Sequence, residues 1–114
     1  MSSLSGKRCL PCEGGVAPLS IDSVQSLLEQ PHPDWQTSGE DHGIVRVFAF
    51  ANYYETMAFV NAVAWVAHQE DHHPDLQVVY NRCTVSYTTH AIGGLSENDF
   101  ICAAKIDELH LAQP

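Results

Sequence analysis

Apolar residues recur at helical spacing in three stretches of the chain. The first follows Ser20, a residue type that favours helix N-termini, and stops at Pro31. The longest contains Phe59, Val63 and Val66 on one stripe, with Ala58, Ala62 and Trp65 forming a second stripe beside it. The last follows Ser96-Glu97-Asn98-Asp99, which has the spacing of a capping box. We therefore expect helices over residues 21–30, from 52 or 53 to about 69, and from about 96 to 111.

Alternation with a period of two predicts strands between these helices. It is clearest over residues 83–88, where Cys83, Val85 and Tyr87 share one face. The stretch 44–50 also alternates, but both of its faces are largely apolar, which favours some cover from a second subunit. Strands are expected over residues 35–37, 44–50, 76–80 and 83–88.

The resulting order is helix, strand, strand, helix, strand, strand, helix. Hairpins separated by helices favour an α+β fold, a four-stranded antiparallel sheet with three helices packed on one face. Residues 1–18 show no periodicity and are expected to be a flexible tail. Residues 19–114 are expected to form a single domain.

Charge and composition exclude several classes of function. The net charge is −9 and only five residues are Lys or Arg, so the basic face of a nucleic-acid binder is missing and binding to anionic membranes is disfavoured. No apolar run is long enough to span a bilayer, and the N-terminus lacks the apolar region of a signal peptide. We expect a cytoplasmic protein.

The four cysteines do not make a convincing metal site. Cys9 and Cys12 form a C-x-x-C in the N-terminal stretch, while Cys83 and Cys102 stand alone within predicted elements. A structural zinc site would need a second close pair. Free thiols are the preferred interpretation.

The densest polar stretch is His68–Asp75, which holds three of the seven histidines and contains Pro74, a residue that prevents the long helix from continuing. It has three interpretations. It can be a solvated helix end, where imidazoles meet the negative pole of the helix dipole. His68 and His72, four residues apart, can chelate a metal, although Gln69 stands where H-E-x-x-H has its Glu. Acid–base chemistry suits the histidines better, because an imidazole exchanges protons near neutrality.

A second polar island, Ser86-Tyr87-Thr88-Thr89-His90, precedes the Gly93-Gly94 loop. Taken alone, His90 is predicted to be a surface residue at the end of a strand. We expect the two islands to face each other across one pocket, where His90 joins His72 and His73. No nucleophile elbow, phosphate loop or dinucleotide fingerprint accompanies them.

His68-x-x-x-His72-His73-Pro74, then Tyr80, His90 and Asp99 at matching spacings, resembles the signature of the pterin-4a-carbinolamine dehydratase family. Thr89-His90 and Gly94–Asp99 strengthen the resemblance, which covers roughly residues 19–110. This chain departs from the family signature at two positions. Many relatives have Glu in place of His68, and many have Trp in place of Leu76.

The resemblance implies an enzyme that removes water from 4a-hydroxytetrahydropterin and yields quinonoid dihydropterin, so that the pterin cofactor of aromatic amino-acid hydroxylases is recycled. It implies a pterin substrate, no metal or cofactor, a hydroxylase as pathway partner, and a homodimer or homotetramer. The residues carried over as catalytic are His72, His73 and His90. Those expected to bind or orient the substrate are His68, Asp71, Pro74, Thr89 and Asp99.

The alternative comes from another class of protein. Some family members serve as dimerisation cofactors or assembly factors without catalysis, and the apolar surplus of residues 44–50 and of the long helix also suits an oligomeric interaction module.

Overall fold

The computed structural model describes residues 4–10, 17–39 and 42–111. Its helices are η1 (Leu4–Gly6), α1 (Ile21–Leu28), α2 (Tyr53–Glu70), η2 (His90–Ile92) and α3 (Glu97–Leu111). Its strands are β1 (Gln36–Ser38), β2 (Gly43–Ala49), β3 (Asp75–Val79) and β4 (Arg82–Tyr87). The expected order of three helices and four strands is confirmed, and the boundaries differ from the prediction by one or two residues. Helix α1 ends at Leu28 because the ring of Pro31 disfavours helical geometry in the residue before it.

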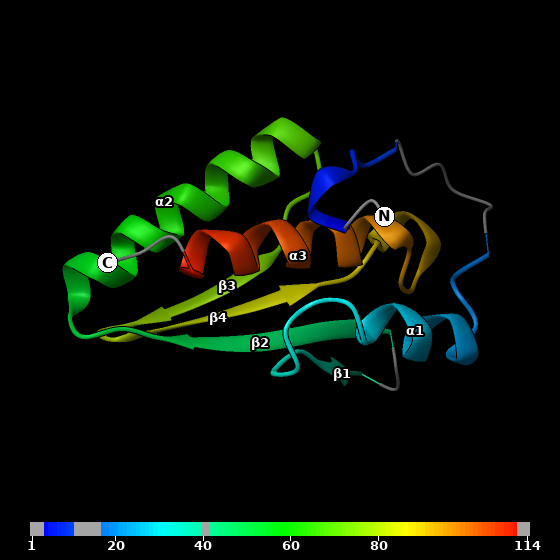
Figure 1. Cartoon of the computed structure of the whole chain (residues 1–114), viewed down its shortest axis with the longest axis horizontal. Helices are drawn as coiled ribbons and strands as arrows, with labels where there is room; N and C mark the ends of the chain where they lie inside the picture. The colour runs from blue at the N-terminus through cyan, green and yellow to red at the C-terminus, as the bar shows by residue number, and fades with distance from the viewer. Residues whose placement is uncertain (1–3, 11–16, 40–41, 112–114) are drawn as a thin grey trace.

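The four strands form one antiparallel sheet in the order β1-β2-β4-β3. Helices α2 and α3 cross one face of this sheet (Figure 1). The two central strands turn apolar side chains toward these helices, and all of them are buried: Ile44 and Phe48 from β2, and Cys83, Val85 and Tyr87 from β4. The expected α+β class with helices on one face is therefore confirmed.

Helix α2 buries the first of its two apolar stripes. Phe59, Val63 and Val66 lie in the core, and Phe59 packs against Phe48 at a ring separation of 4.6 Å. On the second stripe, Trp65 is 60% exposed in the single chain. The outer face of β2 is similar, since Val47 is 52% exposed. Among the described residues, no helix has the length and apolarity needed to cross a bilayer.

A buried ion pair joins the sheet to α3. The guanidinium of Arg46 on β2 lies 2.6 Å from the carboxylate of Asp107 and 4.2 Å from the centre of the Phe48 ring. The same carboxylate accepts hydrogen bonds from the Trp35 indole at 2.8 Å and from the backbone N–H of His32 at 2.9 Å. Asp107 therefore fixes the segment between α1 and β1 as well as β2.

Residues 1–18 are expected from the sequence to be a flexible tail, whereas the structure packs residues 4–10 against the domain. Leu4 is buried beside α3, and the backbone of Cys9 and Leu10 hydrogen-bonds the side chains of Glu70 and Asn98. These partners lie some 60 to 90 residues away in the sequence, so no local pattern reveals them. Residues 1–3 and 11–16 lie outside the described part of the chain.

Candidate functional site

The site begins where helix α2 ends. Asp71 adopts the left-handed conformation, with φ of 53°, and its backbone N–H bonds the carbonyls of Ala67 and His68. The N–H of His72 then returns to the carbonyl of Ala67 at 3.1 Å. This left-handed turn closes the helix and reverses the chain direction. It places His72 against helix α3 rather than along the axis of α2.

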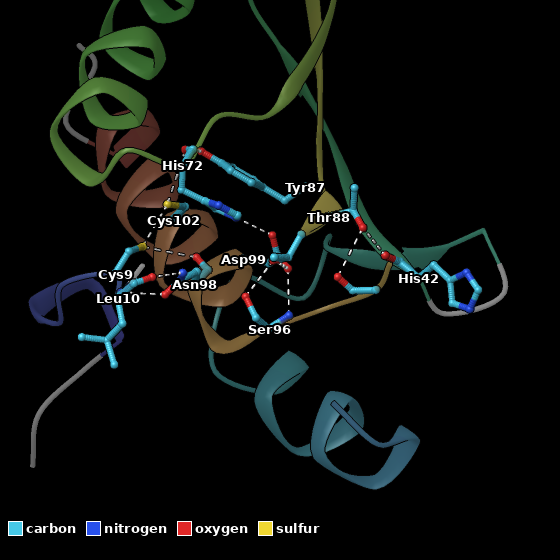
Figure 2. Close-up of polar contacts among 12 residues, drawn as sticks. Cys9, Leu10, His42, His72, Tyr87, Thr88, Ser96, Asn98, Asp99 and Cys102 are labelled. Atoms are coloured by element: carbon cyan, nitrogen blue, oxygen red, sulfur yellow. Dashed lines mark hydrogen bonds and ion pairs between the residues drawn. The ribbon is translucent and has the colours of Figure 1, made fainter. Parts of the chain in front are cut away.

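His72 makes the central contact of the site. Its Nε2 lies 2.6 Å from Oδ1 of Asp99, and the two side chains are 12% and 0% exposed. The Tyr87 ring stacks on the imidazole with an interplanar angle of 13° and a centroid separation of 5.3 Å. Figure 2 shows the imidazole directed from the turn toward Asp99, with Tyr87 along its face. Asp99 thus holds the His72 imidazole at one edge, and Tyr87 covers one of its faces.

Asp99 is positioned by the start of helix α3. Its Oδ2 accepts hydrogen bonds from the backbone N–H of Ser96 at 2.9 Å and from the Thr89 hydroxyl at 2.8 Å. The Ser96 hydroxyl in turn hydrogen-bonds the Thr89 hydroxyl at 2.7 Å. The capping-box spacing predicted from the sequence therefore fixes a buried carboxylate, because Asp99 bonds back to the residue that precedes the helix.

Two opposing effects act on the pKa of His72. Burial lowers it, because a charged imidazolium loses hydration. The hydrogen bond to Asp99 and the negative charge of that carboxylate raise it, with smaller contributions from Cys102 and Asp71. The net result is a pKa above the ordinary value of 6.5. His72 therefore keeps its proton to a higher pH than an ordinary histidine does.

The turn that carries His90 contacts the His72–Asp99 pair through Thr89. The backbones of Thr89 and Gly94 bond each other at 2.9 and 3.4 Å, and the turn between them carries η2 and ends at Gly93 with a φ of 66°. Thr89 is buried against Asp99, so His90, the next residue, starts beside the His72 site. The structure thus brings the ends of both polar islands together.

The other residues predicted for the site lie around this pair. His73 and His90 are exposed, and their side chains make no hydrogen bond or ion pair with the residues that the structure describes. Pro74 is half-buried. His68 is exposed and packs its ring on Trp65 at 5.6 Å, whereas His72 turns to Asp99, so the two do not converge as a chelating pair. No metal-binding group of three His, Cys, Asp or Glu side chains occurs within the described ranges.

Two further residues contribute to the site in ways that the sequence does not show. The alternation over residues 83–88 placed Tyr87 on one face with Cys83 and Val85, but it could not show that the Tyr87 ring stacks on His72. Cys102 is buried on α3, and its sulfur lies 4.0 Å from the carbonyl oxygen of His72. Both contacts join elements that are distant in the sequence, so only the fold reveals them.

A buried carboxylate, a paired imidazole of raised pKa and two exposed imidazoles nearby define a class of site suited to general acid–base chemistry. Comparison with known proteins gives the family. The family model described as "Pterin 4 alpha carbinolamine dehydratase" matches residues 17–109. The chain belongs to the pterin-4a-carbinolamine dehydratase family, as the sequence signature indicated.

Relatives from two bacterial genera match nearly the whole chain. A protein of Nitrosomonas eutropha is 64% identical over 106 residues, 93% of this chain and 92% of the relative. A protein of Legionella pneumophila is 54% identical over 108 residues, 95% and 96% of the two chains. Both carry the provisional name of pterin-4-alpha-carbinolamine dehydratase.

Two solved structures share the fold. The transcriptional coactivator/pterin dehydratase of Brucella melitensis matches with a TM-score of 0.77 at 28% identity, over 82% of this chain and 98% of that one. A pterin dehydratase-like protein described as a RuBisCO assembly factor of the alpha-carboxysome matches with a TM-score of 0.62 at 23% identity, over 72% and 95%. The second likeness concerns the fold alone.

Proposed function

We propose that this protein is a hydro-lyase that dehydrates 4a-hydroxytetrahydropterin to quinonoid dihydropterin and so takes part in tetrahydropterin recycling. The observation that carries the proposal is the His72–Asp99 pair, which lies within the residues that match the family model and makes a 2.6 Å contact in the structure. A buried carboxylate at this distance orients the imidazole and favours its protonated form.

The chemistry requires two proton transfers. The hydroxyl on C4a leaves as water after it gains a proton from a general acid. A general base removes the proton from N5, and its electrons form the C4a=N5 double bond. His72, His73 and His90 are the groups that we assign to these transfers. Each such transfer contributes on the order of 10²–10⁴-fold to the rate.

The remaining residues of the site are assigned supporting roles. Thr89 holds the Asp99 carboxylate, and Asp99 orients His72. Asp71 sets the turn that precedes the histidine pair, while Pro74 restricts the backbone after it. His68 stands at the end of α2, where its role is to border the pterin rather than to transfer a proton.

We further propose that the enzyme is a homodimer or homotetramer in the cytoplasm and acts with an aromatic amino-acid hydroxylase that produces its substrate. Oligomerisation is supported by large apolar side chains that stay exposed in the single chain, among them Tyr54 at 83% and Trp65 at 60%. The cytoplasm is supported by the free thiols of Cys9, Cys83 and Cys102. Light scattering on the purified chain tests the assembly: a monomeric mass of 12.6 kDa at micromolar concentration contradicts it.

A second candidate function is a non-catalytic interaction or assembly role on the same fold. The exposed apolar stripe of α2 favours it, and the names of the two structural neighbours include a coactivator and an assembly factor. In that case the histidines are retained without being used.

A stopped-flow assay with chemically generated 4a-carbinolamine separates the two candidates. The dehydratase proposal expects the wild-type protein to accelerate the loss of water well beyond the spontaneous rate. A variant in which His32 is replaced serves as the control, because His32 is an exposed histidine in the segment between α1 and β1. This variant should keep the wild-type rate. A wild-type protein that leaves the spontaneous rate unchanged supports the non-catalytic role instead.

A further inference from the structure

Two cysteines that are far apart in the sequence meet behind the histidine site. Cys9 lies in the N-terminal segment and Cys102 in helix α3, 93 positions later, yet their sulfur atoms are 3.5 Å apart. Cys102 is fully buried, whereas Cys9 is partly exposed. Figure 2 shows the two sulfurs on the side of α3 that faces the His72 turn. The acid–base chemistry proposed above uses neither thiol.

The short segment Arg8–Leu10 is anchored on both sides of Cys9. The Arg8 guanidinium lies 3.0 Å from the Glu70 carboxylate, which also accepts the backbone N–H of Cys9 at 2.7 Å. The backbone of Leu10 exchanges two hydrogen bonds with the Asn98 side chain, at 3.0 and 2.6 Å. The segment Arg8–Leu10 has no regular secondary structure. Its hydrogen bonds and its ion pair with Glu70 and Asn98 therefore hold Cys9 against Cys102.

The surroundings also favour ionisation of one thiol of the pair. The hydrogen bond from Cys9 lowers the pKa of Cys102 against the effect of burial, and the Tyr87 hydroxyl and the charge of His72 act in the same direction. The same shared hydrogen bond raises the pKa of Cys9, since Cys9 keeps the remaining proton. The pair can thus lose one proton while the other stays between the two sulfurs, and a thiolate is the reactive form of cysteine.

We propose that Cys9 and Cys102 are a redox-active thiol pair that reacts with a low-molecular-weight disulfide and closes to an intramolecular disulfide, which latches the N-terminal segment onto helix α3. The reaction starts from the pair that has lost one proton. The accessible Cys9 sulfur attacks the small disulfide as its proton passes to the Cys102 thiolate. One small thiolate leaves and a mixed disulfide remains on Cys9. Cys102 then gives its proton to that thiolate and attacks the Cys9 sulfur, which expels the second small thiolate. In sum, the singly protonated pair and one small disulfide give one protein disulfide, one small thiol and one small thiolate.

The bond requires only a small movement. A disulfide has its sulfurs about 2.05 Å apart, so the two atoms must approach by about 1.5 Å. Cys102 is fixed in a helix, and the segment around Cys9 is the part that shifts. The disulfide would join this segment to α3, the helix that also carries Asp99. The Cys102 sulfur lies 4.0 Å from the His72 carbonyl oxygen, so oxidation stiffens the part of the fold that holds His72 and Asp99.

The test uses the full chain with oxidised glutathione as the probe. After reaction, free thiols are alkylated and the digest is mapped by mass spectrometry. We expect one linked peptide pair that contains Cys9 and Cys102, reversal by dithiothreitol, and an upward shift in Tm of at least about 5 °C for the oxidised protein, because the bond closes a long loop. Wild-type mapping needs no variant, so the result does not depend on the folding of a mutant.

Three single substitutions make the result specific. Cys12→Ser and Cys83→Ser should keep the linked pair and the Tm shift, and Cys102→Ser should abolish both. The nearest competitor is a bond between Cys9 and Cys12, which are three positions apart in the sequence. Mapping of the bond to Cys9 and Cys12, arrest at a glutathione adduct on Cys9, or absence of any disulfide would overturn the proposal.

Discussion

His72 shows at the scale of single residues how one contact decides the protonation of a site. Burial alone would keep the imidazole neutral, because its charge loses hydration. Asp99, fully buried and 2.6 Å away, reverses this preference, and Thr89 together with the Ser96 backbone keeps the carboxylate in place. The proton of His72 therefore depends on a residue that need not touch substrate.

Replacement of Asp99 by Asn should lower the pKa of His72 below its ordinary value of 6.5, because the effect of burial then acts without its counter-charge. The measurement is a pH titration of the histidine rings by NMR. Glu97→Gln is the matched control, since it removes an exposed carboxylate from the same helix and should leave the pKa of His72 nearly unchanged. An unaltered pKa in Asp99→Asn would contradict this account.

The same pair makes the free energy of unfolding depend on pH. The pKa of His72 is higher in the folded chain than in the unfolded chain, so protonation stabilises the fold. This contribution is complete below the unfolded value of about 6.5 and is lost as the pH rises through the higher folded pKa. Urea denaturation at several pH values should show this loss in the wild type and not in Asp99→Asn. A wild-type stability that rises over this window relative to the variant would be inconsistent with the sign.

Most residues of the candidate site could be named from the sequence, but their arrangement could not. The spacing from His72 to His90 and Asp99 indicated the family, and the capping-box spacing marked Asp99. The stacking of Tyr87 on His72 depends on how strand β4 and the turn after α2 approach each other. Such a contact has no local signature, because it joins segments that pack only in the folded chain.

At the scale of elements, the end of helix α2 directs the histidine pair. Asp71 occupies a left-handed position, with φ of 53°, and its exposed side chain makes no hydrogen bond or ion pair with the described residues. Glycine adopts this conformation without steric cost, whereas a β-branched residue does so with strain. The turn therefore constrains the backbone at position 71 more than the chemistry of its side chain.

Asp71→Gly should keep or slightly raise stability and should retain the raised pKa of His72. Asp71→Val should lower the free energy of unfolding by about 1–2 kcal/mol, because valine strains the left-handed turn. Chemical denaturation of the two variants gives the comparison. If the glycine variant lost as much stability as the valine variant, the carboxylate rather than the backbone would govern the turn.

The positions of the elements were predictable because each has local signals, such as the Ser20 cap, the alternation in β4 and Pro31 after α1. The N-terminal segment was not. Its order comes from single side chains, Glu70 and Asn98, that bind backbone groups near Cys9. A segment held in this way looks like a tail in the sequence.

At the scale of the whole molecule, one carboxylate connects three parts of the domain. Asp107 of α3 binds Arg46 of β2, the Trp35 indole and the backbone of His32. Both charged side chains are about nine-tenths buried, so removing one leaves the other without a partner in a region of low polarity. These contacts cross the interface between the sheet and helix α3.

Asp107→Ala should therefore lower the free energy of unfolding by about 3–5 kcal/mol, which is the usual effect of breaking a buried pair. The neighbouring Glu108→Ala, which removes an exposed carboxylate, should change stability by no more than about 0.5 kcal/mol. Thermal and urea unfolding provide the measurement. Equal effects of the two substitutions would contradict the structural role of Asp107.

The central claim is catalysis by the histidines, and its most direct measurement is the stopped-flow rate of water loss from the 4a-carbinolamine. The wild type is compared with His72→Gln, His73→Gln and His90→Gln, each checked for native folding by circular dichroism. We expect kcat/KM to fall by about 10²-fold or more when a histidine that transfers a proton is replaced, while the fold persists. Wild-type kcat/KM in all three folded variants would contradict the account.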